Sequence, residues 1–240
     1  MKIKMIRILA IIIIFSNATY SQSFEAFFEQ TNEFLQNNVS TDGKIDYARL
    51  KRSPGELLYI LNNVNDLTLA IAKPNEKIAF YINVYNLNVI KNVVENYPIS
   101  SVKDIPDFYE KKSNVAGDNL SLTNIEAILK KLTDNQGVNF ALSKGRLDSA
   151  HLLNAAYLPQ TLDYQIGLHV KNEVNKPGFM KINKADKSIE LMNVFYENKA
   201  EFVTKYFNEI DFINVFLDKK IDNKLKVYYQ KQDLRLNDNK

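Results

Sequence analysis

The sequence contains no cysteine, no tryptophan and only two histidines among 240 residues. The absence of cysteine excludes disulfides, thiolate metal ligands and a thiol nucleophile, and two histidines are too few for a histidine-rich metal site. Only seven glycines and six prolines are present, which excludes collagen-like and low-complexity chains. The hydrophobic share of 45% and the charged share of 25% are typical of a folded domain. We expect no metal and no other cofactor.

The N-terminus has the pattern of a secretory signal peptide. Three basic residues precede the apolar run 8–15, and small and polar residues follow it. This run is shorter than the roughly 20 residues that a membrane-spanning helix needs. We therefore predict a signal peptide over residues 1–21, with cleavage after Ser21 or alternatively after Ala18. The mature chain is expected to have no membrane span and to be exported, either to the periplasm or as a secreted protein.

The charge of the mature chain is balanced. Removing the predicted signal peptide removes three of 31 basic residues, so 28 remain against 28 acidic residues, none of which lies before Glu25. A neutral chain gives no electrostatic reason to expect a nucleic-acid partner. The segment 219–240 has seven basic residues against three acidic ones, and we expect it to be a solvated tail.

Hydrophobic spacing predicts a mostly helical α+β fold with a small β-sheet. The mature chain, residues 22–240, shows no internal repeat and no linker, so we predict a single domain. The expected elements are helices over about 24–35, 54–65, 75–97 and 125–134, short strands on both sides of Gly117, a buried strand over 137–142, a helix that begins at Pro159, a hairpin formed by 179–182 and 188–191, and helical segments near the C-terminus.

The segment 75–97 is expected to be a buried central helix, because apolar residues occupy nearly every direction around it. Asn83 and Asn86 lie three residues apart on one face of this helix. A buried amide needs hydrogen-bond partners, so both side chains either bind nearby backbone and hold adjacent loops or line a ligand pocket. Tyr85 lies between them and is expected to find a local partner for its hydroxyl.

A capping box is predicted at the start of the following helix. Thr123 and Glu126 have the spacing at which a hydroxyl and a carboxylate satisfy backbone donors of the first helical turn. The pattern therefore gives Glu126 a structural role.

Several blocks of the sequence resemble, in order, those of the "domain of unknown function 547" family. These blocks are Ala79–Asn86, Asp42–Tyr47, Asn96–Pro98 with Ser101–Ile105, Leu120–Leu122 with Ile125–Glu126, and Tyr157–Pro159 with Leu162 and Gln165. The resemblance covers roughly residues 30–202. It implies a single α+β domain that is often exported in bacteria and has no established reaction.

The chain departs from the family pattern where chemistry would be expected. In the family, the residue after Glu126 and the residue at position 139 are usually histidines, and the next loop usually carries two cysteines. This chain has Ala127, Asn139, Lys144 and Ser149 at those positions. A cluster of histidine, cysteine and glutamate would suit a thiol nucleophile or a metal site. We therefore expect a degenerate, non-catalytic relative, a pseudoenzyme that acts as a binding or scaffold domain.

The expected ligand is a small molecule or a protein, and two cations in the loop favour an anionic one. Lys144 and Arg146 lie where the family has its first cysteine and a neighbour. The predicted binding residues are Asn83, Tyr85, Asn86, Glu126, Asn139, Lys144 and Arg146.

Two enzymatic alternatives stay open. In the first, a hydrolase uses Ser149 as nucleophile and His151 as base, with Glu126 or Asp148 orienting the histidine. In the second, carboxylates and His151 form a metal-dependent site. His169 shares a helix face with apolar residues and is expected to be a semi-buried residue with satisfied hydrogen bonds.

Overall fold

The fold is described from a computed structural model that defines residues 24–239. The predicted signal peptide, residues 1–21, lies outside the described residues. Among the residues that are described, none of the helices combines the length and the apolar character needed to cross a membrane. The fold is mostly helical with two small sheets, so the predicted mostly helical α+β class is confirmed.

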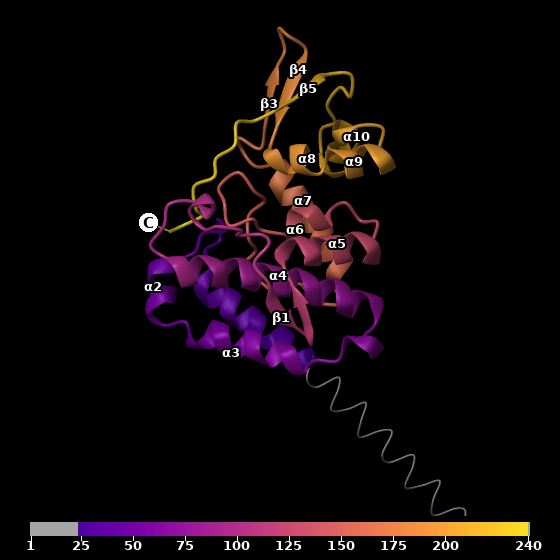
Figure 1. Ribbon diagram of the computed structural model, residues 1–240. Helices are drawn as coiled ribbons and strands as arrows, with labels where there is room; N and C mark the ends of the chain where they lie inside the picture. The colour runs from indigo at the N-terminus through magenta and orange to yellow at the C-terminus, as the bar shows by residue number, and fades with distance from the viewer. Residues whose placement is uncertain (1–23, 240) are drawn as a thin grey trace, which may run out of the picture.

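Helices form the body of the molecule, and a small three-stranded sheet lies at one end (Figure 1). At the opposite end lie the helix formed by residues 24–38, α2 (Tyr47–Arg52) and α3 (Gly55–Asn63). Two short 3-10 turns, Val64–Asp66 and Leu69–Ile71, then lead into the central helix. The ring centres of Phe27 in the first helix and Phe80 in the central helix lie 5.3 Å apart, so the first helix packs on the central one.

The central helix α4 (Pro74–Asn96) is buried on most sides, as its sequence predicts. Proline is tolerated in its first turn, where the missing N–H would have no helical partner. Buried residues follow one another almost without interruption from Ile78 to Val94. Helix α4 is therefore the core element against which the first helix, α2 and α3 pack.

The hairpin before helix α5 (Leu122–Leu132) is confirmed, whereas the predicted capping box is wrong. Strands β1 (Ser113–Val115) and β2 (Asp118–Leu120) pair antiparallel. The capping residue is Ser121, which exchanges hydrogen bonds with Asn124. Thr123 already lies within the first turn, so Glu126 takes no part in capping.

The predicted strand over 137–142 is also wrong, because Val138–Ala141 forms the short helix α6. Buried apolar residues in so short a run fit a strand or a helix equally well. Helix α6 packs against α7 (Leu162–Val174), and none of the described strands pairs with it. A Cβ at Gly137 would lie 2.7 Å from a methyl group of Ile166, so glycine permits this close packing. Helix α7 begins at Leu162, three residues after the predicted start at Pro159.

The second sheet follows helix α7. Strands β3 (Met180–Asn183) and β4 (Ser188–Leu191) form the predicted hairpin, and β5 (Lys226–Tyr229) pairs parallel to β4. Three short helices lie between β4 and β5, and their bounds are α8 (Asn193–Glu197), α9 (Lys199–Lys205) and α10 (Glu209–Phe216). Their phenylalanines pack on Phe140 of α6, which joins this part to the body.

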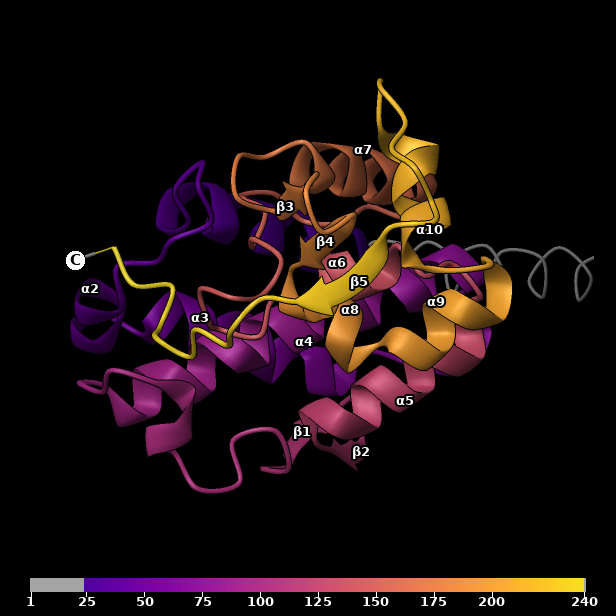
Figure 2. The same ribbon diagram turned by 90° about the horizontal axis from the view of Figure 1, so that it is seen from above.

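The segment after β5 is not the solvated tail that its charge suggests. It runs from the sheet back along the molecule toward α2 (Figure 2). Backbone bonds join it to three loops: Leu147 N–H donates to Arg235, Leu236 N–H donates to Ser100, and Ile45 N–H donates to Asn237. Leu236 and Asn237 are buried. Backbone pairing and these two buried side chains outweigh the tendency of the charged neighbours to stay in water.

Candidate functional site

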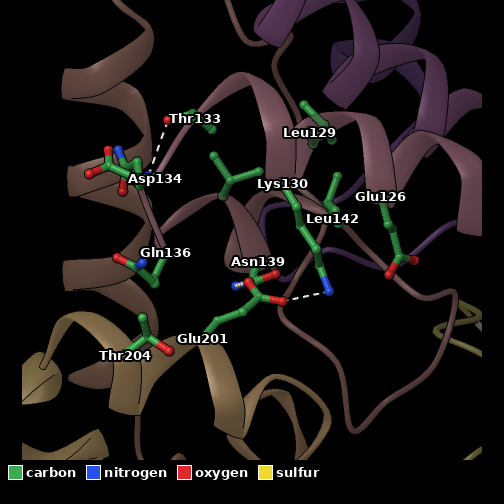
Figure 3. A pocket seen from close by; sticks show the side chains of 12 residues that line it. Glu126, Leu129, Lys130, Thr133, Asp134, Gln136, Asn139, Leu142, Glu201 and Thr204 are labelled. Atoms are coloured by element: carbon green, nitrogen blue, oxygen red, sulfur yellow. Dashed lines mark hydrogen bonds and ion pairs between the residues drawn. The ribbon is translucent and has the colours of Figure 1, made fainter. Parts of the chain in front are cut away.

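A pocket of about 240 Å³ lies between α5, α6 and α9 (Figure 3). Its polar lining residues are Glu126, Lys130, Thr133, Asp134, Asn135, Gln136, Asn139, Glu201 and Thr204. Three apolar side chains, Leu129, Val138 and Leu142, complete its wall. The structure therefore brings Glu126 and Asn139, two of the predicted binding residues, into one cavity.

Glu126 is held at the edge of this pocket by two other predicted binding residues. The Tyr85 hydroxyl donates to Glu126 Oε1 over 2.7 Å, and the Lys144 ammonium lies 2.5 Å from the same oxygen. The ammonium also lies 5.5 Å from the ring centre of Tyr85 and 5.8 Å from that of Tyr109. Burial raises the pKa of Tyr85 well above its ordinary value, and the Glu126 charge adds to the effect. Tyr85 thus stays a hydrogen-bond donor to Glu126.

Asn139 faces a partner that sequence reasoning missed. Its amide nitrogen donates to Glu201 Oε2 over 3.0 Å, and Lys130 Nζ lies 2.5 Å from Glu201 Oε1. Figure 3 shows the Lys130 side chain reaching across the cavity toward Glu201. Glu201 belongs to α9, far along the chain from α5 and α6. No motif marks it, and only the folding of α9 onto this face makes it part of the site.

The charged groups of this pocket are mostly carboxylates. Three carboxylates, those of Glu126, Asp134 and Glu201, line it together with the ammonium of Lys130. Gln136 adds a buried side-chain oxygen that accepts no hydrogen bond from any described residue. A buried acceptor without a partner is costly, on the order of 1–3 kcal/mol. Each carboxylate is paired with a lysine, and the partners of Glu201 and Asp134, Lys130 and Lys205, have exposed side chains.

The two cations expected to attract an anion are both paired within the protein. Lys144 pairs with Glu126, as described above. Arg146 lies 2.9 Å from Asp148 and 2.6 Å from Glu197, and its side chain is only 7% exposed. Burial acts to lower the pKa of Arg146, but its interactions, including those with both carboxylates, raise it above its ordinary value. Neither cation is therefore available to attract the anionic ligand that the sequence predicts.

Asn83 and Asn86 use their amides to hold two loops. Asn83 accepts from the backbone N–H of Tyr157 and donates to the carbonyl of the same residue. Asn86 donates to the Ala141 carbonyl and accepts from the Ser143 N–H, each over 2.9 Å. These amides either hold adjacent loops or line a ligand pocket, and their hydrogen bonds match the first interpretation.

The residues of the predicted hydrolase are not brought together. The Ser149 hydroxyl donates to the Arg146 carbonyl over 2.8 Å and accepts from the Lys144 N–H. His151 instead places Nδ1 2.9 Å from Glu173 Oε2, and Glu126 binds Lys144. No hydrogen bond joins Ser149 to His151 within residues 24–239. In the same part of the chain, no group of three or more histidine, aspartate or glutamate side chains is arranged to hold a metal.

Glu173 is a second residue that sequence reasoning missed. It is 1% exposed, and both histidines of the chain lie beside it. His169, expected to be semi-buried with satisfied hydrogen bonds, is fully buried: Nδ1 lies 2.5 Å from the Tyr157 hydroxyl, whereas Nε2, 3.6 Å from Glu173, has no hydrogen-bond partner among the described residues. The sequence does carry a signal, because residues 169 and 173 are four apart and share a helix face. The sequence gives no signal for the contact between His151 and Glu173, however, because tertiary structure brings the loop of His151 to α7.

The fold and this cavity define a mostly helical α+β protein with a small pocket at the junction of three helices. Residues 69–171 match the model of the family described as "Protein of unknown function, DUF547". This match confirms, over those residues, the resemblance found in the sequence. The matched segment contains Glu126, Asn139 and Lys144 but not Glu201. No curated protein matches the chain, and no solved structure matches it.

Proposed function

We propose that this protein is an exported binding protein whose pocket between α5, α6 and α9 holds a small cationic ligand without transforming it. The observation that carries the proposal is that the pocket carboxylates of Glu201 and Asp134 form ion pairs, among the described residues, only with exposed lysines, Lys130 and Lys205, which a ligand ammonium can displace. An ammonium group is a compact cation with several N–H donors, and it suits such a lining.

Lys130 supports a cationic ligand. Its ammonium lies 2.5 Å from Glu201 Oε1 at the pocket, and its side chain is 47% exposed. An exposed ion pair of this kind contributes at most about 1 kcal/mol, so a ligand ammonium can displace it. The methylene groups of a ligand would then contact Leu129, Val138 and Leu142. When the ligand binds, its ammonium replaces the Lys130 ammonium beside Glu201.

The interactions around the loop that contains Lys144 and Ser149 favour binding over catalysis. Glu126 is engaged by Tyr85 and Lys144, and the Ser149 hydroxyl is used by the backbone of its own loop. A serine needs an adjacent base to act as a nucleophile. At the positions where the family usually has histidine and cysteine, the polar side chains of this chain, those of Asn139, Lys144 and Ser149, are engaged by other groups of the protein.

Export rests on the pattern of residues 1–21 and is part of the same proposal. The test is to express the full chain in a Gram-negative bacterium, separate periplasm from cytoplasm and determine the intact mass. We expect a periplasmic protein that begins at Gln22, or at Thr19 if cleavage follows Ala18. A full-length protein confined to the cytoplasm would show that the pattern is not a signal peptide.

The ligand proposal is tested by calorimetric titration with cadaverine, a diamine whose ends resemble a lysine side chain. We expect the wild-type protein to bind it, and Glu201→Gln to weaken binding about tenfold or more, because a charge-assisted hydrogen bond contributes about 1.5–3 kcal/mol. Glu56→Gln removes an exposed carboxylate on α3 and is the control. Equal binding by both variants, or none by the wild type, would refute a cationic ligand in this pocket.

A further inference from the structure

A second pocket, of about 580 Å³, lies on the side of α7 that carries Glu173. His151 and Glu173 line it, and Leu147, Phe179 and Met192 supply apolar wall. The proposed ligand pocket shares no lining residue with it. Among its polar lining residues, His151 places Nδ1 2.9 Å from Glu173 Oε2.

Glu173 is fixed and charged. Its carboxylate is 1% exposed, and His151, His169 and Lys176 all pair with it. Burial acts to raise its pKa, but the interactions with these neighbours, above all the hydrogen bond from His151, outweigh burial and lower the pKa well below 4.5. Tyr157 adds no second negative charge, because burial raises its pKa well above its ordinary value. At neutral pH, Glu173 is therefore an ionised acceptor.

This carboxylate determines which nitrogen of His151 carries the proton. An ionised carboxylate accepts only, so the neutral imidazole places its hydrogen on Nδ1 and leaves a lone pair on Nε2. No described residue forms a hydrogen bond with Nε2, and the side chain is 36% exposed beside the pocket. A histidine oriented by a buried carboxylate and open at Nε2 is the arrangement that general-base catalysis requires.

We propose that His151, oriented by Glu173, is a general base that activates water for hydrolysis of a small ester in this pocket. This activity goes beyond the proposed binding function and uses a different cavity. His151 Nε2 removes a proton from water, and the water oxygen forms a bond to the acyl carbon. The bond from that carbon to the leaving oxygen then breaks, and the leaving oxygen takes the proton back from Nε2. The products are a carboxylic acid and an alcohol, and no other reactant is consumed.

One cation in the pocket is available to stabilise the oxyanion that forms on the acyl oxygen. Lys231 lines the pocket, and its ammonium forms no ion pair with the described carboxylates. Lys176, in contrast, is engaged by Glu173. Glu173 touches neither water nor ester in this scheme, so it is a positioning residue.

The test is the hydrolysis of p-nitrophenyl acetate by the purified protein, followed through several turnovers. We expect His151→Gln to lower the rate about 100-fold or to the rate in buffer, since general-base catalysis contributes about 10²–10⁴-fold. Lys184→Gln, at an exposed position in the β3–β4 turn, is the control for acylation of surface amines. Circular dichroism and urea unfolding establish that each variant is folded.

Glu173→Gln separates positioning from structure. We expect a folded variant with a lower kcat and an unchanged KM for the ester, because the imidazole has lost the acceptor that orients it. Wild-type turnover that His151→Gln leaves unchanged would overturn the proposal. A single stoichiometric acylation without turnover would also overturn it, because it would identify a reactive amine and not a general base.

Discussion

Buried polar side chains in this protein are used mainly to bind other parts of the chain. Asn83 and Asn86 provide hydrogen bonds to loop backbone that no strand satisfies. Glu126 and Glu173 are paired with cations, which offsets part of the cost of removing a carboxylate from water. The type of residue could be predicted from the sequence, whereas the partner could not. Asn86 was recognised as buried, but its bonds to Ala141 and Ser143 depend on where a distant loop lies.

The stability of the protein in acid depends on Glu173. Its folded-state pKa is lowered, so its contribution to stability is present above the ordinary value of 4.5 and is lost as the pH falls below it. We expect the free energy of unfolding to fall more steeply from about pH 5 to pH 3 in the wild type than in Glu173→Gln. Urea unfolding at a series of pH values measures this slope.

The control for this prediction is Glu56→Gln, an exposed position on α3. It should follow the wild-type slope, because an exposed carboxylate without a buried partner contributes little to stability. A Glu173→Gln protein with the wild-type slope would show that Glu173 is not strongly stabilised in its ionised form.

Long elements were predictable from the sequence and short ones were not. Helix α4 and the β3–β4 hairpin have patterns that extend over enough residues to specify one structure. In contrast, the four residues of α6 fit either a helix or a strand, and tertiary packing decides between them. The segment after β5 was predicted wrongly for the same reason, because its composition is polar but its backbone partners come from three distant loops.

The C-terminal segment is expected to stabilise the fold through Asn237. The Tyr47 hydroxyl donates to the Asn237 side chain over 2.8 Å, and Asn237 donates to the Gly43 carbonyl over 3.0 Å. Both bonds are buried, so we expect Asn237→Ala to lower the free energy of unfolding by about 2 kcal/mol. Arg235→Ala, two residues earlier and exposed, should change it by less than about 0.5 kcal/mol. Urea unfolding followed by circular dichroism compares the two, and equal effects would contradict an anchoring role for Asn237.

For the whole molecule, the candidate pocket is assembled from helices that are far apart in the sequence. The family match covers α5 and α6 and ends at residue 171, before α9 begins. Glu126 and Asn139 could therefore be selected from the sequence, whereas Glu201 and the ion pair with Lys130 required the folded structure. Helices α5 and α6 lie within the matched segment, and α9, outside it, adds Glu201 to the pocket.

The most direct test of a cationic ligand compares cadaverine affinity in Lys130→Met and Lys131→Met. Both variants lose one positive charge on α5, but of the two lysines only Lys130 forms an ion pair with Glu201. We predict that Lys130→Met binds cadaverine about fivefold more tightly than Lys131→Met, because the ligand no longer displaces an ion pair of about 1 kcal/mol. If Lys130→Met binds no more tightly than Lys131→Met, the ligand ammonium does not take the place of Lys130, and the proposed binding mode is wrong.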